Sequence, residues 1–161
     1  MHGELYAREY GFDERFEAHV AHGLAGLAAL GQARDVPPVR EPGRLWVAER
    51  AGEPVGTVAL TDEGGGVGQL RWFLVAPQAR GAGLGRLLLR TLLDHAREQG
   101  YDHVKLWTVD VLHAAARLYT DVGFRCTERR QAHLFGHPWR SCATTSTCSE
   151  PRSTARGRPL T

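Results

Sequence analysis

A glycine-rich turn between an apolar run and a leucine-rich stretch is the part of this sequence best suited to bind an anion. Residues 80–85 read Arg-Gly-Ala-Gly-Leu-Gly and follow the alternating apolar run at 70–75. Glycines remove side-chain bulk, so successive backbone N–H groups can approach a phosphate. A helix beginning at Leu84 would point its free N–H groups and its positive dipole end at the same place. The spacing therefore predicts a phosphate-binding cradle.

The same glycines exclude two common nucleotide-binding loops. The turn lacks the Gly-Lys-Ser/Thr of a P-loop, and its glycines at 81, 83 and 85 do not follow the G-x-G-x-x-G spacing of a dinucleotide fold. A second motif, Tyr119-x-x-x-Gly123-Phe124, lies further along the chain. On a helix Leu112, Ala115 and Tyr119 share a face.

The two motifs together, Arg80-x-x-Gly83-x-Gly85 and Tyr119-x-x-x-Gly123-Phe124, resemble those of the GNAT acetyltransferase superfamily. The resemblance covers residues 3–137. It looks closest to GNAT domains fused to MarR-like DNA-binding regulators, through residues 2–11, 13–17, 106–108 and 135–137. It implies transfer of an acetyl group from acetyl-CoA to a primary amine of a small molecule or peptide, with Tyr119 as the acid that protonates the departing thiolate. The cofactor-binding residues that it implies are Phe73, Leu74, Val75, Arg80, Gly81, Ala82, Gly83, Leu84, Gly85 and Arg86.

The general base stays open, because residues 70–75 contain no carboxylate where many relatives carry one. Glu9, Glu49 or a chain of waters are the alternatives. Each candidate also has a plainer interpretation: the charged residues as solvated surface, and Tyr119 as a core aromatic. Position 112 is leucine where many GNAT enzymes have a cofactor-binding asparagine.

No metal site is predicted. His133 and His137 are four residues apart, which in a strand separates them by about 13 Å, too far to share one ion.

Periodicity predicts an α/β fold with a GNAT-like mixed, mostly antiparallel sheet flanked by helices, whose first strand is missing or vestigial and whose last strand is atypical. One helix is expected to begin near Leu84, and two others are expected to be capped by Asp13 and Asp110. The expected strands are residues 44–49, 55–61, 70–75, 103–108 and 123–134.

Composition divides the chain into a GNAT-like domain at 1–137 and an atypical tail at 138–161. The tail is rich in Ser, Thr, Arg and Pro, which is typical of disorder. We therefore expect a short, weakly packed strand at 139–148, or none. Either outcome would leave an open sheet edge through which a homodimer could form.

Charge and cysteine content limit which binding partners and which cellular compartment are expected. The net charge is +2, and the tail carries four arginines against one glutamate, so the basic excess lies outside the expected domain and no direct nucleic-acid partner is predicted. No apolar run approaches membrane-span length. Three cysteines suggest no disulfide framework, and the expected location is the cytoplasm. Two alternatives remain: an acetyl-CoA-binding module without turnover, and a regulatory partner of a MarR-like transcription factor.

Overall fold

The computed structural model describes residues 5, 8–9, 18, 20–25, 43–134 and 137–148. Its elements from residue 43 onward are six strands, two helices and one 3-10 turn. They are β1 (Gly43–Arg50), β2 (Glu53–Asp62), β3 (Val67–Val75), η1 (Pro77–Ala79), α3 (Leu84–Glu98), β4 (His103–Val109), α4 (His113–Asp121), β5 (Arg125–Leu134) and β6 (His137–Thr147).

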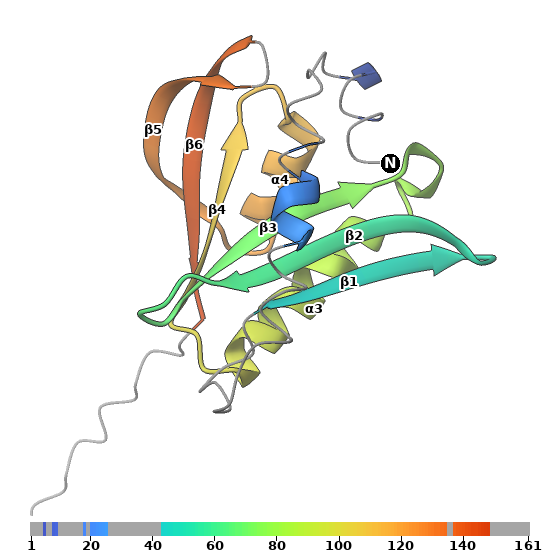
Figure 1. Ribbon diagram of the computed structural model, residues 1–161, viewed down its shortest axis with the longest axis horizontal. Coiled ribbons are helices and arrows are strands. Elements are labelled where there is room, and N and C mark those ends of the chain that lie inside the picture. Colours follow the sequence, from blue (N-terminus) through green and yellow to red (C-terminus); the bar gives the residue numbers. More distant parts are fainter. Residues whose placement is uncertain are drawn as a thin grey trace, which may run out of the picture.

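The six strands form one sheet in the order β1-β2-β3-β4-β6-β5 (Figure 1). Only β3 and β4 run parallel, because α3 carries the chain back to the same end of the sheet between them. Helices α3 and α4 cover one face, and the helical residues 20–25 lie on the other (Figure 1). The predicted mixed, mostly antiparallel sheet flanked by helices is confirmed.

The main core lies between α3 and the first half of the sheet. Leucines at 88, 89, 92 and 93 face β2 and β3, where the buried partners include Val58, Leu60 and Leu70. Leu87 on the same helix is 61% exposed, whereas Leu89 faces inward and is fully buried. Helix α4 also begins at His113, with Leu112 as its N-cap, and not at Asp110.

Strands β3 and β4 separate after a short paired stretch. Their parallel register covers only Val67–Gln69 against His103–Lys105, although both strands continue beyond it. A bulge follows on β3, where Trp72 takes a positive φ of 50° and its carbonyl accepts a hydrogen bond from Thr57 Oγ1 at 2.8 Å. The end of β3 is thereby turned away from β4.

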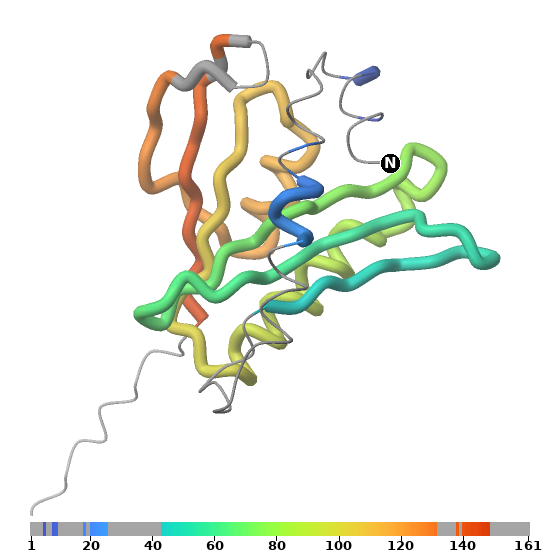
Figure 2. The backbone as a smooth tube through the Cα atoms, in the orientation of Figure 1, coloured from blue at the N-terminus to red at the C-terminus, as the bar shows by residue number. Residues whose placement is uncertain are grey.

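Strand β6 corrects the expectation for the segment at 139–148. It extends from His137 to Thr147 and pairs antiparallel with β4 on one side and β5 on the other (Figure 2). The expectation of a short strand or none was therefore wrong. Strand β6 also crosses the expected boundary between domain and tail at 137/138. The chemical reason is that both neighbours present unpaired backbone groups to this slot, and threonines tolerate strand geometry. Residues 149–161 lie outside the described residues.

A disulfide joins β5 to β6, against the expectation from cysteine number. Cys126 and Cys142 are bonded, with their Cα atoms 6.1 Å apart, and Cys148 remains a buried free thiol. The pairing arises because the register brings two cysteines 16 residues apart onto neighbouring strands. Because disulfides are typical of oxidising compartments, the number of cysteines no longer supports the expected cytoplasmic location.

Candidate cofactor-binding site

A cavity of about 520 Å³ opens where the end of β3 meets the first turn of α3. Its walls come from β3, the loop at 79–81, the start of α3, α4, and two residues near the N-terminus. The described residues that line it are Leu5, Glu9, Phe73, Leu74, Val75, Ala79, Arg80, Gly81, Gly83, Leu84, Gly85, Arg86, Leu112, Ala114, Ala115, Arg117 and Leu118.

The N-terminus of α3 is open toward this cavity. Gly83 is its N-cap with a φ of 80°, no side chain caps the helix, and its first turn has no acidic residue. Gly81 has a similar φ of 81°. A Cβ at either glycine would meet nothing within 4 Å, so glycine is required there by the backbone conformation and not by space. Unpaired helix N–H groups and the dipole make this end attractive to an anion.

Gly85 has a different role. A Cβ there would lie 3.0 Å from Cδ1 of Leu118 and 3.3 Å from Cζ of Phe73. The missing side chain therefore lets α3 approach α4 and β3 closely, which shapes the wall behind the open helix end.

The charged residues on the wall are three arginines and one glutamate. Arg80 is held in place, because its Nε donates to the Val75 carbonyl at 3.1 Å and its two amino groups bind the Glu9 carboxylate at 3.1 and 3.0 Å. Arg86 pairs with Asp121 at 2.9 Å, with both side chains about half exposed. Arg117 makes no ion pair with any described residue. The wall therefore carries an excess of positive charge.

Tyr119 lies apart from the cavity wall. Its ring is 7% exposed and packs between Phe73 and Phe124, at centroid distances of 5.7 and 5.9 Å. The neighbouring residues Leu112, Ala115 and Leu118 line the cavity, while Tyr119 turns into the core. Its role as the acid stays a prediction.

The structure gathers every predicted cofactor-binding residue except Ala82 on one wall. Sequence reasoning missed Arg117 and the other α4 residues, and it considered Glu9 only as a base and not as the partner of Arg80. In the described residues no three His, Cys, Asp or Glu side chains gather closely enough to hold a metal ion. Within the described ranges, no helix combines the length and the apolar run that a bilayer span requires.

The fold is α/β, and the uncapped N-terminus of α3 beside the open end of its mixed sheet has a geometry that favours an anion. Comparison identifies the family: a profile of the acetyltransferase (GNAT) family matches residues 4–124 of the 161. The chain belongs to this family of acyltransferases.

Two curated relatives and one solved structure illustrate the similarity. N-acetyltransferase 8F1 of Rattus norvegicus is 40% identical over 103 residues, which are 61% of this chain and 45% of that protein. An uncharacterized N-acetyltransferase of Schizosaccharomyces pombe, C1271.07c, is 32% identical over 129 residues, 76% of this chain and 72% of its own length. A GNAT family acetyltransferase from Elizabethkingia anophelis with acetyl-CoA bound has a TM-score of 0.57 at 20% identity, with 66% of this chain and 76% of the other covered. This chain thus spans less than half of the rat relative and most of the yeast one.

Proposed function

We propose that the protein is an acetyl-CoA-dependent N-acetyltransferase that acts on a primary amine of a small molecule or peptide. The observation that carries the proposal is the open N-terminus of α3, which faces a cavity whose wall bears three arginines and one glutamate. A diphosphate fits this chemistry, because the backbone N–H groups and guanidinium groups are all donors. The bound acetyl-CoA of the Elizabethkingia anophelis protein supports the choice of cofactor.

Each part of the wall has a proposed task. Residues 80–86 hold the diphosphate, with Arg80 positioned by Glu9 and by the Val75 carbonyl. Residues 73–75 lie beyond the last β3–β4 pair, so backbone groups on that side of β3 can bind the pantetheine arm.

The reaction is an acyl transfer. The amine nitrogen bonds to the thioester carbonyl carbon, the C–S bond breaks, the amine proton passes to a base, and the departing thiolate takes a proton from an acid. Positioning of the two reactants, together with donors near the carbonyl oxygen, supplies the rate gain. Tyr119 is the proposed acid. Glu49 or a water chain is the proposed base, because the Glu9 carboxylate is bound by the Arg80 guanidinium at the diphosphate end of the cavity.

Substitution of Gly83 by Glu tests the cofactor assignment. A side chain at a φ of 80° strains the N-cap, and its carboxylate would place negative charge at the helix N-terminus. Acetyl-CoA binding measured by calorimetry should be lost. Gly52→Glu is the matched control, because Gly52 has a φ of 81°, has equally open space and lies in the β1–β2 turn. Unchanged affinity in folded Gly83→Glu would remove the assignment.

A module that binds acetyl-CoA without turnover is the second candidate. It is favoured by one observation, namely that Tyr119 is absent from the residues on the cavity wall. Tyr119→Phe keeps the packing and removes the proton donor, so an acid role predicts a fall in turnover of about 10²- to 10⁴-fold. A fall of less than about threefold would leave Tyr119 with a packing role alone.

A regulatory partnership with a MarR-like protein, suggested only by resemblance, would be tested by copurification.

A further inference from the structure

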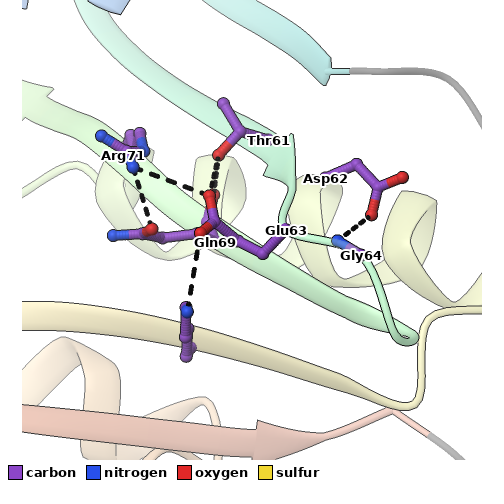
Figure 3. Close-up of polar contacts among 7 residues, drawn as sticks. Thr61, Asp62, Glu63, Gly64, Gln69 and Arg71 are labelled. Carbon is purple, nitrogen blue, oxygen red and sulfur yellow. Dashed lines mark hydrogen bonds and ion pairs between the residues drawn. The ribbon is translucent and has the colours of Figure 1, made fainter.

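A cluster of polar residues lies on the sheet face opposite α3, beside the point where β3 leaves β4 (Figure 3). Arg71 Nη2 donates to Oε1 of Gln69 at 3.0 Å and lies 3.6 Å from a Glu63 oxygen. The other Glu63 oxygen lies 3.6 Å from Lys105 Nζ. Two cations therefore share a single carboxylate.

The face on which these side chains lie follows from the strand alternation. Leu70 is in the core that α3 covers, so Gln69 and Arg71 on either side of it point to the opposite face. Lys105 is flanked in the same way by the core residues Val104 and Leu106. The cluster is thus built on the two central parallel strands.

Arg71 is incompletely satisfied. Its side chain is 29% exposed, and its Nε is enclosed and has no hydrogen-bond partner in the described part of the chain. A buried donor of a charged group is normally paired, so an unpaired one needs an explanation. A guanidinium can bind a carboxylate through two parallel N–H groups, Nε and one amino group, so a carboxylate admitted by a small shift of the groups that enclose Nε would satisfy this donor.

The same face carries further groups suited to an organic anion. The Arg130 guanidinium lies 4.0 Å from the ring centroid of Trp107, which is 37% exposed. Glu128 also lies on this face, because it pairs with Ala143 in line with Trp107. Arg125 shares this face, because it pairs with Thr145 in line with Lys105, so the cations Arg71, Lys105, Arg125 and Arg130 outnumber the carboxylates of Glu63 and Glu128.

We propose that the acceptor amine carries a carboxylate, as an amino acid does, and that Arg71 and Lys105 bind this carboxylate. The proposal rests on the acetyltransferase function above and adds the class of acceptor. Arg71 immediately precedes the bulge at Trp72, and Phe73 on the cofactor cavity follows one residue later. Two residues of strand span about 7 Å. An acceptor held by Arg71 therefore has its amine near residues 73–75, to which the pantetheine arm is assigned.

Substitution of Glu63 should change carboxylate affinity in a direction that a purely structural network does not predict. Its carboxylate occupies the position between the two cations. An incoming carboxylate must compete with it. Glu63→Gln should therefore strengthen the binding of a carboxylate, whereas a network that only stabilises the fold predicts weaker or unchanged binding.

The experiment compares carboxylates with their amides, without requiring turnover. N-acetyl amino acids, the expected products, and the matching N-acetyl amino acid amides are titrated into the protein with CoA present. We expect the acids to bind at least tenfold more tightly than the amides. Arg71→Gln should reduce acid binding at least tenfold and leave amide binding unchanged, and Glu63→Gln should tighten acid binding. Arg90→Gln, on the exposed side of α3, is the control and should change neither.

Three outcomes would overturn the inference: no acid preferred over its amide in the series, equal loss of both in folded Arg71→Gln, or weaker acid binding by Glu63→Gln. If Arg71→Gln does not fold, Lys105→Gln and Glu63→Gln decide in its place. Thiol release with free amino acids and amino acid amides separates this inference from the proposed function. Transfer to acids and amides alike rejects the carboxylate site alone. Acid binding without any transfer supports the site and rejects the transferase function.

Discussion

The two halves of the sheet, on either side of the point where β3 parts from β4, are stabilised differently. In the first half, Leu60 and Leu70 meet the leucines of α3 in a continuous apolar core. In the second half, β6 turns Thr144 and Ser146 toward the α4 side, and both are buried. Thr144 Oγ1 is enclosed and has no hydrogen-bond partner in the described part of the chain. The apolar cluster continues under the second half through Leu106 and Phe124, so the difference lies in β6, which contributes buried polar side chains where the first half contributes leucines.

The difference shows how a strand with little apolar surface can occupy the middle of a sheet. Strand β6 satisfies backbone groups of β4 on one edge and of β5 on the other. Leaving those N–H and C=O groups buried and unpaired would be costly. A disulfide to β5 adds a covalent link. Backbone hydrogen bonds and the disulfide therefore stabilise β6 in this half, whereas leucine packing stabilises the first half.

The largest difference between the halves should appear on truncation of a core side chain. Leu89 on α3 is fully buried, so Leu89→Ala should lower the free energy of unfolding by about 2–5 kcal/mol. The comparison variant Ser146→Ala removes a hydroxyl and no carbon from the core, and its effect should be below about 1 kcal/mol. Chemical denaturation of both variants measures the contrast. Similar losses in the two would show that the halves are equally dependent on side-chain burial.

The first half of the fold was predictable from sequence because its signals are local. The leucine repeat after Leu84 reports burial directly, since one face of α3 is covered. The alternation at 70–75 predicts the strand, but it fails at the Trp72 bulge, after which Phe73 and Leu74 are both buried. The serines and threonines of β6 carry no such period, and what places them is pairing with strands distant in sequence. The start of α4 was misplaced for a related reason, because an acid at 110 is a common cap but Leu112 occupies that position.

The disulfide gives the second prediction. A double variant with Cys126→Ser and Cys142→Ser should lower the free energy of unfolding by roughly 3 kcal/mol, because it opens a loop of 16 residues in the unfolded chain. Reductant should destabilise the unchanged protein by a similar amount and leave the double variant unaffected. Burial, with a smaller effect from Asp102, outweighs Arg97 and raises the pKa of the Cys148 thiol, so exchange with this third cysteine should be slow. Equal unfolding curves with and without reductant would contradict the link.

The part of the candidate site that is formed by residues contiguous in the sequence was predictable. The turn at 80–86 is both the sequence motif and one wall of the cavity, so its spacing was sufficient. The partner of Arg80 is 71 residues away, at Glu9, and no local pattern indicates that contact. Tyr119 shows a second limit, because a helical face is broad and its orientation is set by tertiary packing. Leu118 meets the cavity, and Tyr119 one residue later meets Phe124 in the core. The cluster at Arg71 likewise depends on pairing between strands.

The smallest expected effect concerns the polar interior of β6 and has the opposite sign. Thr144→Val keeps the side-chain shape and removes a buried hydroxyl that has no partner in the described residues. Loss of an unsatisfied group should raise the free energy of unfolding by about 1 kcal/mol. Thr145→Val is the matched control, since Thr145 points to the other face and is partly exposed, and its effect should stay within about 0.5 kcal/mol. A loss of stability in Thr144→Val would mean that polar side-chain contacts also stabilise β6. The two halves would then differ in the type of their side-chain contacts and not in how strongly these contacts stabilise them.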